Sequence, residues 1–230
     1  MKIKAVSFDV GNTLVRYNNP LNWKTLYIPA LEQVVEQCRI RLPEDGIEQA
    51  ASVLTKYNTR ENPREKEVSS ETIFKEILDV WGQPYHLLPP VKSAFYGFFQ
   101  ADAVCYEDAV DTLQVLRSKG VKVGALTDVA YGMDDSFSLQ DIAAIQPLFD
   151  LVLTSVDVGY RKPHKAGFLK LLQEFHVSPS QMMYVGDEQK DIVGANSLGI
   201  VSVLINRDRT PPDWGQTHNI QSLQDLCQLI

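Results

Sequence analysis

The sequence has few of the residues and patterns that mark secreted or membrane proteins. Its 230 residues include three cysteines, Cys38, Cys105 and Cys227, which are odd in number and form no CxxC pair. We therefore expect free thiols in a reducing compartment. No apolar run approaches the roughly 18 residues that span a bilayer, and Asp9 interrupts the first apolar stretch too early for a signal peptide. The sequence thus predicts a cytoplasmic protein without a membrane partner.

Positive charge is also scarce. The 22 Lys and Arg residues are outnumbered by 29 Asp and Glu residues, which gives a net charge of −7. Such a chain has no sequence-wide attraction to phosphodiester backbones, so we expect no nucleic-acid partner. The sequence contains neither internal repeats nor low-complexity segments, and it leaves the choice between a monomer and a homodimer open.

Apolar residues make up 44% of the chain, and they are gathered into short runs. Five runs rich in Val, Ile and Leu are continuous rather than alternating, which is typical of strands covered on both faces by helices. They cover residues 3–8, 121–126, 151–155, 182–185 and 200–205. Helical patterns lie between them at 108–118, 163–175 and 188–198. This alternation predicts an α/β fold with a doubly wound parallel sheet of the Rossmann-like type.

One interval departs from this alternation. The first predicted strand ends near residue 8 and the next begins near residue 121, whereas a simple crossover unit takes about 30 residues. Within the interval, the spacing of apolar residues predicts helices over 23–39, 47–57, 70–81 and 91–100. We therefore predict an α/β core of residues 1–15 and 104–230, and a smaller inserted α-helical domain of residues 16–103.

Polar residues follow three of the predicted strands. Asp9 follows the first, Thr127 follows the second, and Asp187 and Asp191 follow the fourth with the i, i+4 spacing of a helix start. In an open parallel sheet the carboxyl ends of the strands form the ligand crevice, so we expect these side chains to meet. Converging carboxylates in a crevice favour Mg²⁺, which prefers one or two carboxylates together with a substrate phosphate.

A lysine complements these acids. Lys162 precedes a predicted helix with Pro163 in its first turn, where the ammonium group, the backbone N–H groups and the helix dipole would all favour an anion. This set of groups suits phosphoryl transfer, which uses a carboxylate nucleophile, a divalent cation, a lysine and a hydroxyl such as that of Thr127.

Four motifs in this order resemble those of the haloacid dehalogenase superfamily of hydrolases. They are Asp9-Val10-Gly11-Asn12-Thr13 for its nucleophile motif, Thr127 for its Ser/Thr motif, Lys162-Pro163 for its lysine motif, and Gly186-Asp187 with Asp191 for its acidic motif. The insert at 16–103 resembles, by its position and helical pattern, the cap that one large subgroup of this superfamily carries after the first motif.

The resemblance implies a mechanism in which Asp9 attacks phosphorus and forms an aspartyl-phosphate. Thr127 and Lys162 would hold the phosphoryl oxygens, with Asp128 and Asn12 in the same phosphate-binding region. The substrate implied is a small phosphorylated metabolite, and the activity is that of a phosphomonoester phosphatase.

The resemblance also implies a Mg²⁺ site. Asp9, Asp187 and the backbone carbonyl of Gly11 would bind the ion. Asp191 would orient metal-bound water or the lysine from behind these ligands, and Glu188 would assist there.

Position 11 departs from the pattern of the family. Its phosphatases normally carry a second Asp two residues after the nucleophile, which protonates the leaving group and then activates water, whereas this chain has Gly11. General acid–base assistance is worth roughly 10²- to 10⁴-fold in rate. Asp128, where the family more often has Asn, is one candidate to compensate, and a side chain of the cap is another.

Two other functions stay open at this point. A 2-haloacid dehalogenase-type hydrolase would use the same nucleophile without metal, and the dehalogenases of the superfamily also lack the second Asp. A catalytically impaired protein that binds a phosphorylated ligand is the other alternative. The intact acidic motif favours phosphate ester hydrolysis. We interpret the charged stretch at residues 60–67 as a solvated loop rather than a substrate contact.

Overall fold

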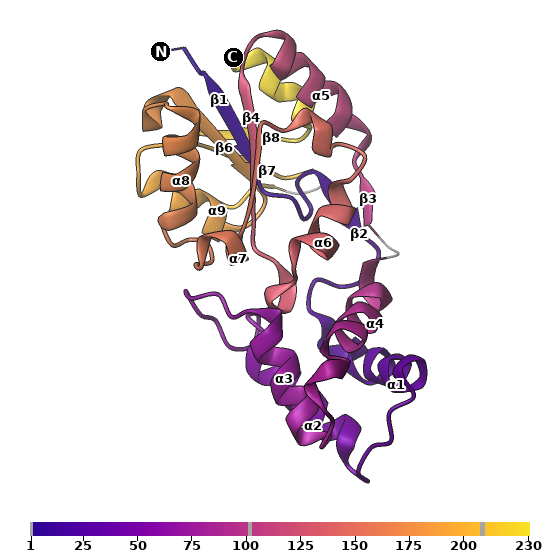
Figure 1. Ribbon diagram of the computed structural model, residues 1–230. Coiled ribbons are helices and arrows are strands. Elements are labelled where there is room, and N and C mark those ends of the chain that lie inside the picture. The colour runs from indigo at the N-terminus through magenta and orange to yellow at the C-terminus, as the bar shows by residue number, and fades with distance from the viewer. Residues whose placement is uncertain (1, 101–102, 208–209) are drawn as a thin grey trace.

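The computed structural model describes residues 2–100, 103–207 and 210–230, which form an α/β part and a helical part (Figure 1). The two termini lie together at the far end of the α/β part from the helices of the insert. None of the helices in these ranges combines the length and the hydropathy that crossing a membrane requires.

A six-stranded parallel sheet lies at the centre of the α/β part. Its order is β5-β4-β1-β6-β7-β8, with β1 at Ala5–Phe8, β4 at Lys122–Thr127, β5 at Leu151–Thr154, β6 at Met182–Gly186, β7 at Val201–Ile205 and β8 at His218–Ile220. The first five match the predicted runs, so the doubly wound parallel sheet is confirmed. The edge strand β8 was not predicted, because Ile220 is the one buried residue among its three.

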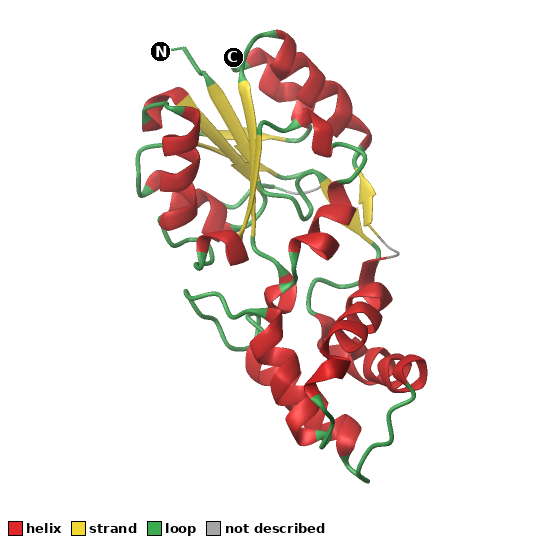
Figure 2. Cartoon of the chain, viewed as in Figure 1, coloured by secondary structure: helices red, strands yellow, loops and turns green. Residues whose placement is uncertain are grey.

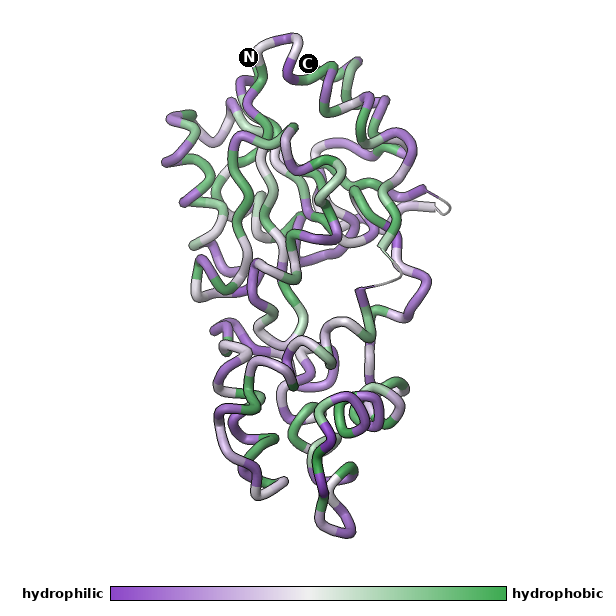
Figure 3. Tube along the Cα trace, turned by 45° about the vertical axis from the view of Figure 1, so that its right-hand side comes forward, coloured by the Kyte–Doolittle hydropathy of each residue, from purple (hydrophilic) through white to green (hydrophobic). Residues whose placement is uncertain are grey.

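Helices cover both faces of this sheet (Figure 2). On one face, α5 (Glu107–Ser118) and the 3-10 segment η7 (Leu223–Gln228) bury Leu113 and Leu226 against the strands. On the other face, α8 (Ala166–Phe175) and α9 (Gln189–Asn196) do the same with Phe168 and Ala195. Burial on both sides explains why every residue of β1 and β6 is buried and why hydrophobic residues line the central strands (Figure 3).

The long helix between β5 and β6, α8, begins later than predicted. The sequence predicts its start at Pro163, whereas α8 begins at Ala166. The residues before it form a turn in which the backbone N–H of His164 donates to the carbonyl of Arg161 at 3.0 Å. The backbone N–H of Lys162 donates to the Asp128 side chain at 3.0 Å. These tertiary contacts hold the turn at the strand ends, so Lys162 does not directly precede the helix as the sequence suggested.

The helical part contains four α-helices at the predicted places. They are α1 (Tyr27–Cys38) with the 3-10 segment η1 (Trp23–Leu26) before it, α2 (Gly46–Tyr57), α3 (Ser70–Val80) and α4 (Leu88–Gln100). Phe74, Phe95 and Tyr96 are fully buried at their centre and meet edge to face. Two short strands, β2 (Val15–Tyr17) and β3 (Ala103–Cys105), pair antiparallel where the chain enters and leaves this part.

A segment from the α/β part completes the core of the helices. Val129, Tyr131 and Met133 follow β4, yet they are buried in the same apolar cluster as the helices of the insert. Tyr96 donates a hydrogen bond from its hydroxyl to the carbonyl of Tyr131 at 2.9 Å. Short elements continue this segment, including η3 (Ala130–Gly132), α6 (Asp135–Ser138), η4 (Leu139–Ile142) and η5 (Gln146–Leu148), with α7 (Ser155–Val158) following β5. The helical part is therefore anchored by the chain after β4 as well as by the β2–β3 pair.

Candidate functional site

A cavity of about 440 Å³ lies between the helical part and the carboxyl ends of β1, β4 and β6. Its wall contains almost all of the residues that the sequence singled out, namely Asp9, Gly11, Asn12, Thr127, Asp128, Lys162, Asp187 and Glu188. Asp191 is fully buried behind this wall. The strand ends therefore bring together residues that are up to 182 positions apart in the chain, as the crossover rule for parallel sheets predicts.

The turn after β1 sets the position of Asp9. The backbone N–H of Asp9 donates to Val185 at 2.8 Å, which continues the pairing of β1 with β6 to the last residue before the turn. The chain then reverses at Asn12, whose φ of 56° is left-handed, a conformation that Asn adopts more readily than most residues. Leu14 donates from its backbone N–H back to Val10 at 2.9 Å and closes the turn. Asp9 is left 7% exposed and faces the cavity.

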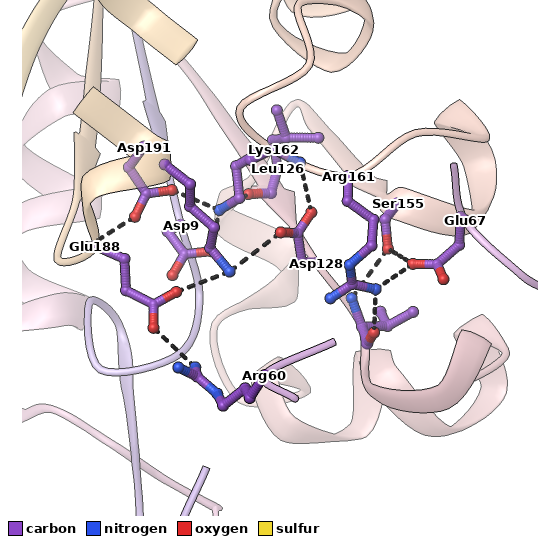
Figure 4. A network of polar contacts seen from close by, with 12 residues as sticks. Asp9, Arg60, Glu67, Leu126, Asp128, Ser155, Arg161, Lys162, Glu188 and Asp191 are labelled. Carbon is purple, nitrogen blue, oxygen red and sulfur yellow. Dashed lines mark hydrogen bonds and ion pairs between the residues drawn. The ribbon is translucent and has the colours of Figure 1, made fainter. Parts of the chain in front are cut away.

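Three carboxylates meet at this point. Asp9, Asp187 and Asp191 each place one oxygen within 4.8 Å of the others. The ammonium group of Lys162 lies 2.5 Å from Asp9 Oδ1 and 2.7 Å from Asp191 Oδ1 (Figure 4). When all three acids are ionised, three negative charges against the positive charge of Lys162 leave a net charge of −2, which one divalent cation would balance. Hard carboxylate oxygens are also the ligands that Mg²⁺ prefers, so the residues present fit such an ion.

The crowding of these acids raises two pKa values. Burial, together with the negative charges of Asp9, Asp191 and Glu188, raises the pKa of Asp187 to about 8. Burial also raises the pKa of Asp191, to about 6, against the opposing effect of Lys162. Like charges held close together away from water disfavour ionisation in this way. A bound cation would reverse the effect and keep both groups ionised.

Lys162 is the cation at the floor of the cavity. Its side chain is 1% exposed, and its ammonium also donates to the Leu126 carbonyl and the Tyr184 hydroxyl at 3.2 Å each. Burial lowers the pKa of the ammonium, but Asp191 and Asp9 outweigh it, so the pKa of Lys162 is raised. The lysine is therefore charged and fixed in position beside Asp9.

A chain of ion pairs crosses from the helical part to the strand ends. Arg60 pairs with Glu188 at 2.8 Å, Glu188 with Lys190 at 2.7 Å, and Lys190 with Asp128 at 3.1 Å (Figure 4). Burial raises the pKa of Glu188, but Lys190 and Arg60 outweigh burial and lower it to about 2. Lys190 and Lys162 likewise outweigh burial and lower the pKa of Asp128. Both carboxylates are therefore held as anions.

Sequence reasoning missed Lys190 and Arg60. Lys190 stands inside the acidic motif, between Asp187 and Asp191, and a lone cation there was the available signal. Arg60 was placed in a solvated loop, yet it lines the cavity together with Arg64. The stretch is largely exposed, Arg60 included, but Arg64 is only partly exposed and both arginines line the cavity.

The last residues of this stretch dock on the α/β part beside Lys162. The Glu67 side chain is 2% exposed, accepts from Ser155 Oγ at 2.5 Å and forms an ion pair with Arg161 (Figure 4). The backbone adds two hydrogen bonds, from Glu67 N–H to Gly159 at 3.0 Å and from Arg161 N–H to Glu65 at 2.8 Å. The helical part is thus joined directly to the turn that carries the buried lysine.

Tyr17 lies beside the position where a second acid is missing. A Cβ atom added at Gly11 would lie 3.4 Å from the Tyr17 ring. The Tyr17 hydroxyl donates to Asp141 Oδ2 at 3.0 Å, and both residues line the cavity. Burial raises the pKa of Asp141, against the opposing effect of the Tyr17 hydrogen bond.

The family model for haloacid dehalogenase-like hydrolases matches residues 3–199 of the chain. Among curated proteins, the chain is similar to glyceraldehyde 3-phosphate phosphatase of Methanocaldococcus jannaschii, with 32% identity over 130 residues, 54% of this chain and 56% of that protein. It is also similar to pyrophosphatase PpaX of Bacillus mycoides, with 32% identity over 101 residues, 44% of this chain and 46% of that protein. The matches thus span about half the length of these relatives.

Solved structures with the same fold cover nearly the whole chain. A phosphatase from Thermococcus onnurineus aligns with a TM-score of 0.66 and 22% identity, over 99% of this chain and 97% of that one. A 2-haloacid dehalogenase from Pseudomonas syringae aligns with the same TM-score of 0.66 and 20% identity, over 99% and 97% of the two chains. At such identities the likeness establishes the fold alone.

Proposed function

Because the chain belongs to the haloacid dehalogenase-like hydrolase family, we propose that it is a Mg²⁺-dependent phosphatase of small phosphorylated metabolites that works through a phosphorylated Asp9. The observation that carries this proposal is the set of Asp9, Asp187 and Asp191 around a single buried lysine. A dehalogenase that works without metal does not need three carboxylates at this point, which together with Lys162 carry a net charge of −2 when all are ionised. The proposal includes a helical cap at residues 16–103 and a location in the cytoplasm.

The names of the curated relatives support the choice of substrate. Glyceraldehyde 3-phosphate phosphatase and pyrophosphatase PpaX are both named for small phosphorylated molecules. The cavity of about 440 Å³ accommodates a molecule of this size with the phosphoryl group at the strand ends.

In the first step, Asp9 attacks the phosphorus atom in line with the leaving oxygen. The new bond joins a carboxylate oxygen to phosphorus, and the bond from phosphorus to the leaving oxygen breaks, with its electron pair staying on that oxygen. Lys162 fixes Asp9 Oδ1 at 2.5 Å, which leaves the other oxygen for attack. Lys162 and the Thr127 hydroxyl hold phosphoryl oxygens, with Asn12 at the edge of the same pocket.

Asp9, Asp187 and the backbone carbonyl of Gly11 would hold the Mg²⁺ ion. When bound, the ion neutralises negative charge on the phosphoryl oxygens and on the carboxylates. Asp191 pairs with Lys162 at 2.7 Å and accepts a hydrogen bond from the backbone of Glu188 at 3.0 Å, so it positions the lysine and the start of α9.

In the second step, water attacks the phosphorus atom of the aspartyl-phosphate and the bond to Asp9 breaks, which restores the carboxylate and releases phosphate. Both steps need a proton carrier, and Gly11 offers none. Asp128 is fixed as an anion by Lys190 and serves as a positioning residue through its bond to the Lys162 backbone. Asp141 has a raised pKa and, among the described carboxyl groups of the cavity outside the three-acid cluster, it alone faces no cation. We assign the proton transfer to the pair of Tyr17 and Asp141. In the first step the Tyr17 hydroxyl gives its proton to the leaving oxygen and takes the carboxyl proton of Asp141. In the second step the attacking water gives a proton back through Tyr17 to the Asp141 carboxylate.

The experiment that tests the function measures phosphate release from p-nitrophenyl phosphate and from a panel of phosphorylated metabolites, with and without Mg²⁺. We expect release that depends on Mg²⁺ and is lost in Asp9→Asn. The matched control is Asp111→Asn, since Asp111 is exposed on α5 and does not line the cavity. Absence of release from the activated ester would contradict the proposal. Halide release from a 2-haloacid without metal would instead identify a dehalogenase.

A further inference from the structure

The helical side of the cavity carries more positive than negative charge at one place. Glu67 pairs with two guanidinium groups, that of Arg161 and that of Arg64, whose Nη2 lies 3.2 Å from Glu67 Oε1. The Glu67 side chain is 2% exposed, and those of Arg161 and Arg64 are 8% and 19% exposed. One carboxylate cannot neutralise two cations, so this cluster holds a net charge of +1 in a largely buried setting.

In the described part of the chain, other charges of the cavity do not pair with this cluster, and the remaining carboxyl group of the wall, Asp141, is bonded to the Tyr17 hydroxyl rather than to an arginine. Arg60, Glu188, Lys190 and Asp128 form a chain of two cations and two anions. The acids at the strand ends serve the metal and the transferred phosphoryl group in the proposed function. Arg64 lines the cavity, and its ion-pair partner is Glu67 rather than any of the acids at the strand ends.

Two buried hydrogen-bond donors in residues that line the cavity also have no partner among the described residues. They are Arg64 Nε and Ser138 Oγ, and both residues line the cavity. A donor that is withdrawn from water and left unpaired is costly, so an acceptor supplied by a bound group would stabilise Arg64 and Ser138. Arg64 Nη1 is already held by the Tyr57 carbonyl at 2.7 Å, which fixes the guanidinium in place.

We propose that Arg64 determines specificity by binding a second anionic group of the substrate, a carboxylate or a second phosphoryl group. The proposal rests on the proposed function, since it takes the phosphoryl group to be bound at Asp9. The preferred substrates are thus phosphate esters or anhydrides with an anionic group at their far end. An arginine fixed in position suits this task because its planar fork matches carboxylate and phosphate oxygens.

A purely structural role for Arg64 has a different signature. If Arg64 only holds Glu67 in place, its loss weakens binding of every substrate by the same factor. If Arg64 binds the far anion, its loss weakens binding of the doubly anionic substrate much more than that of a matched neutral one. The informative quantity is therefore a ratio of dissociation constants for two substrates with the same skeleton.

The test measures binding of 3-phosphoglycerate and glycerol 3-phosphate by calorimetry in the Asp9→Asn background, where turnover does not interfere. These ligands differ in a terminal carboxylate against a terminal hydroxymethyl group. We expect the Asp9→Asn protein to bind 3-phosphoglycerate more tightly than glycerol 3-phosphate. Arg64→Met should weaken the binding of 3-phosphoglycerate roughly 10- to 100-fold more than it weakens the binding of glycerol 3-phosphate, which is the range for a charge-assisted hydrogen bond. Arg64→Lys should fall between, because it keeps the charge without the fork.

The matched control is Lys75→Met, which removes an exposed cation of α3 that pairs with Glu71 and does not line the cavity. It should leave the ratio unchanged. The proposal would be overturned if Arg64→Met left the ratio unchanged both for this pair and for the pair of pyrophosphate and methyl phosphate, or if the Asp9→Asn protein bound the two members of each pair equally.

Pyrophosphate, tested beside methyl phosphate in the same way, shows whether the second anion is a phosphoryl group rather than a carboxylate. A larger Arg64→Met effect in either matched pair supports the inference, and the pair with the larger effect identifies the anion. Binding in the Asp9→Asn background does not depend on turnover. Failure of the proposed function, seen as absence of phosphate release by the unmodified protein, is therefore distinct from failure of this inference.

Discussion

Gly11 is the residue at which this site differs most from the phosphatases that its motifs resemble. The backbone there is not left-handed, and an added Cβ atom would make an ordinary contact of 3.4 Å with the Tyr17 ring. The position therefore has room for a side chain. The backbone of the turn therefore does not require glycine here, and a residue with a carboxyl group would fit.

We accordingly expect Gly11→Asp to increase turnover. An added carboxyl group would give the alkyl leaving oxygen its proton directly, without the transfer through Tyr17. General acid–base catalysis is worth roughly 10²- to 10⁴-fold in rate, and we expect part of it as a gain of about 10-fold or more in kcat for alkyl phosphates. Turnover of p-nitrophenyl phosphate should change less, because its leaving group departs without a proton. Gly11→Asn is the matched control, and an equal gain in that variant would contradict the explanation.

The acids of the site also make metal binding and stability depend on pH. The pKa of Asp187 rises from its ordinary 3.8 to about 8, so the folded protein binds more protons than the unfolded chain between these values. The free energy of unfolding without metal should therefore fall as the pH rises through this window. Mg²⁺ needs the ionised carboxylate, so the increase in Tm on adding Mg²⁺ should be larger at about pH 8 than at about pH 6. Thermal melts at both pH values check this, and a larger increase at the lower pH would contradict it.

Several site residues could be predicted from the sequence and others could not. Asp9, Thr127 and Asp187 follow buried strands, and the topology of a parallel sheet places strand ends together. Arg60 and Tyr17 reach the cavity only because the helical part approaches the strand ends in one particular orientation. No local pattern specifies that orientation, since it depends on contacts such as that of Arg60 with Glu188.

At the scale of elements, the junction of β6 and α9 decides whether the acidic cluster forms. Gly186 is the last residue of β6, and a Cβ atom there would lie 2.4 Å from Asp191 Cγ. The absence of a side chain lets the first turn of α9 fold back over the strand end. Asp191 thereby reaches both Lys162 and the backbone of Glu188.

Gly186→Ala should therefore displace Asp191 and disturb the lysine that it holds. We expect a loss of about 1–3 kcal/mol in the free energy of unfolding from overpacking, together with a loss of most phosphatase activity. Gly97→Ala in α4 is the matched control, because nothing lies within 4 Å of its added Cβ. The control should be neutral or more stable, as alanine is the better helix former. Chemical denaturation and phosphate release measure both effects, and full activity in Gly186→Ala would contradict the role of this junction.

The elements themselves were predictable where burial is continuous. β1 and β6 are buried along their whole length, and their unbroken apolar runs mark them in the sequence. By contrast, β2 and β8 have three residues each, and α6 has four. Segments this short have no period of their own, and tertiary contacts fix their conformation.

At the scale of the whole molecule, the helical part is joined to the α/β part by a buried ion pair as well as by the chain. Glu67 lies against Arg161, which is 8% exposed and also donates to the Val129 carbonyl at 2.8 Å. Lys162 follows Arg161 directly. The position of Lys162 therefore depends on the docking of the helical part.

Glu67→Gln should weaken both the fold and the activity. Removal of one partner leaves the buried charge of Arg161 uncompensated, and we expect a loss of about 3 kcal/mol in the free energy of unfolding. We also expect lower kcat, since the turn that carries Lys162 loses its anchor. Glu61→Gln, at an exposed pair with Lys24, is the matched control and should cost less than about 1 kcal/mol. Equal effects of the two variants would contradict the coupling of docking and catalysis.

The central claim is that water attacks phosphorus and not the carboxyl carbon of Asp9. A single turnover of p-nitrophenyl phosphate in heavy-oxygen water tests it most directly, with mass spectrometry of the released phosphate and of the peptide that contains Asp9. We predict that the heavy oxygen enters the phosphate and that Asp9 stays unlabelled. Label in the Asp9 carboxylate, as water attack on the carbonyl of an ester intermediate would give, would contradict the account.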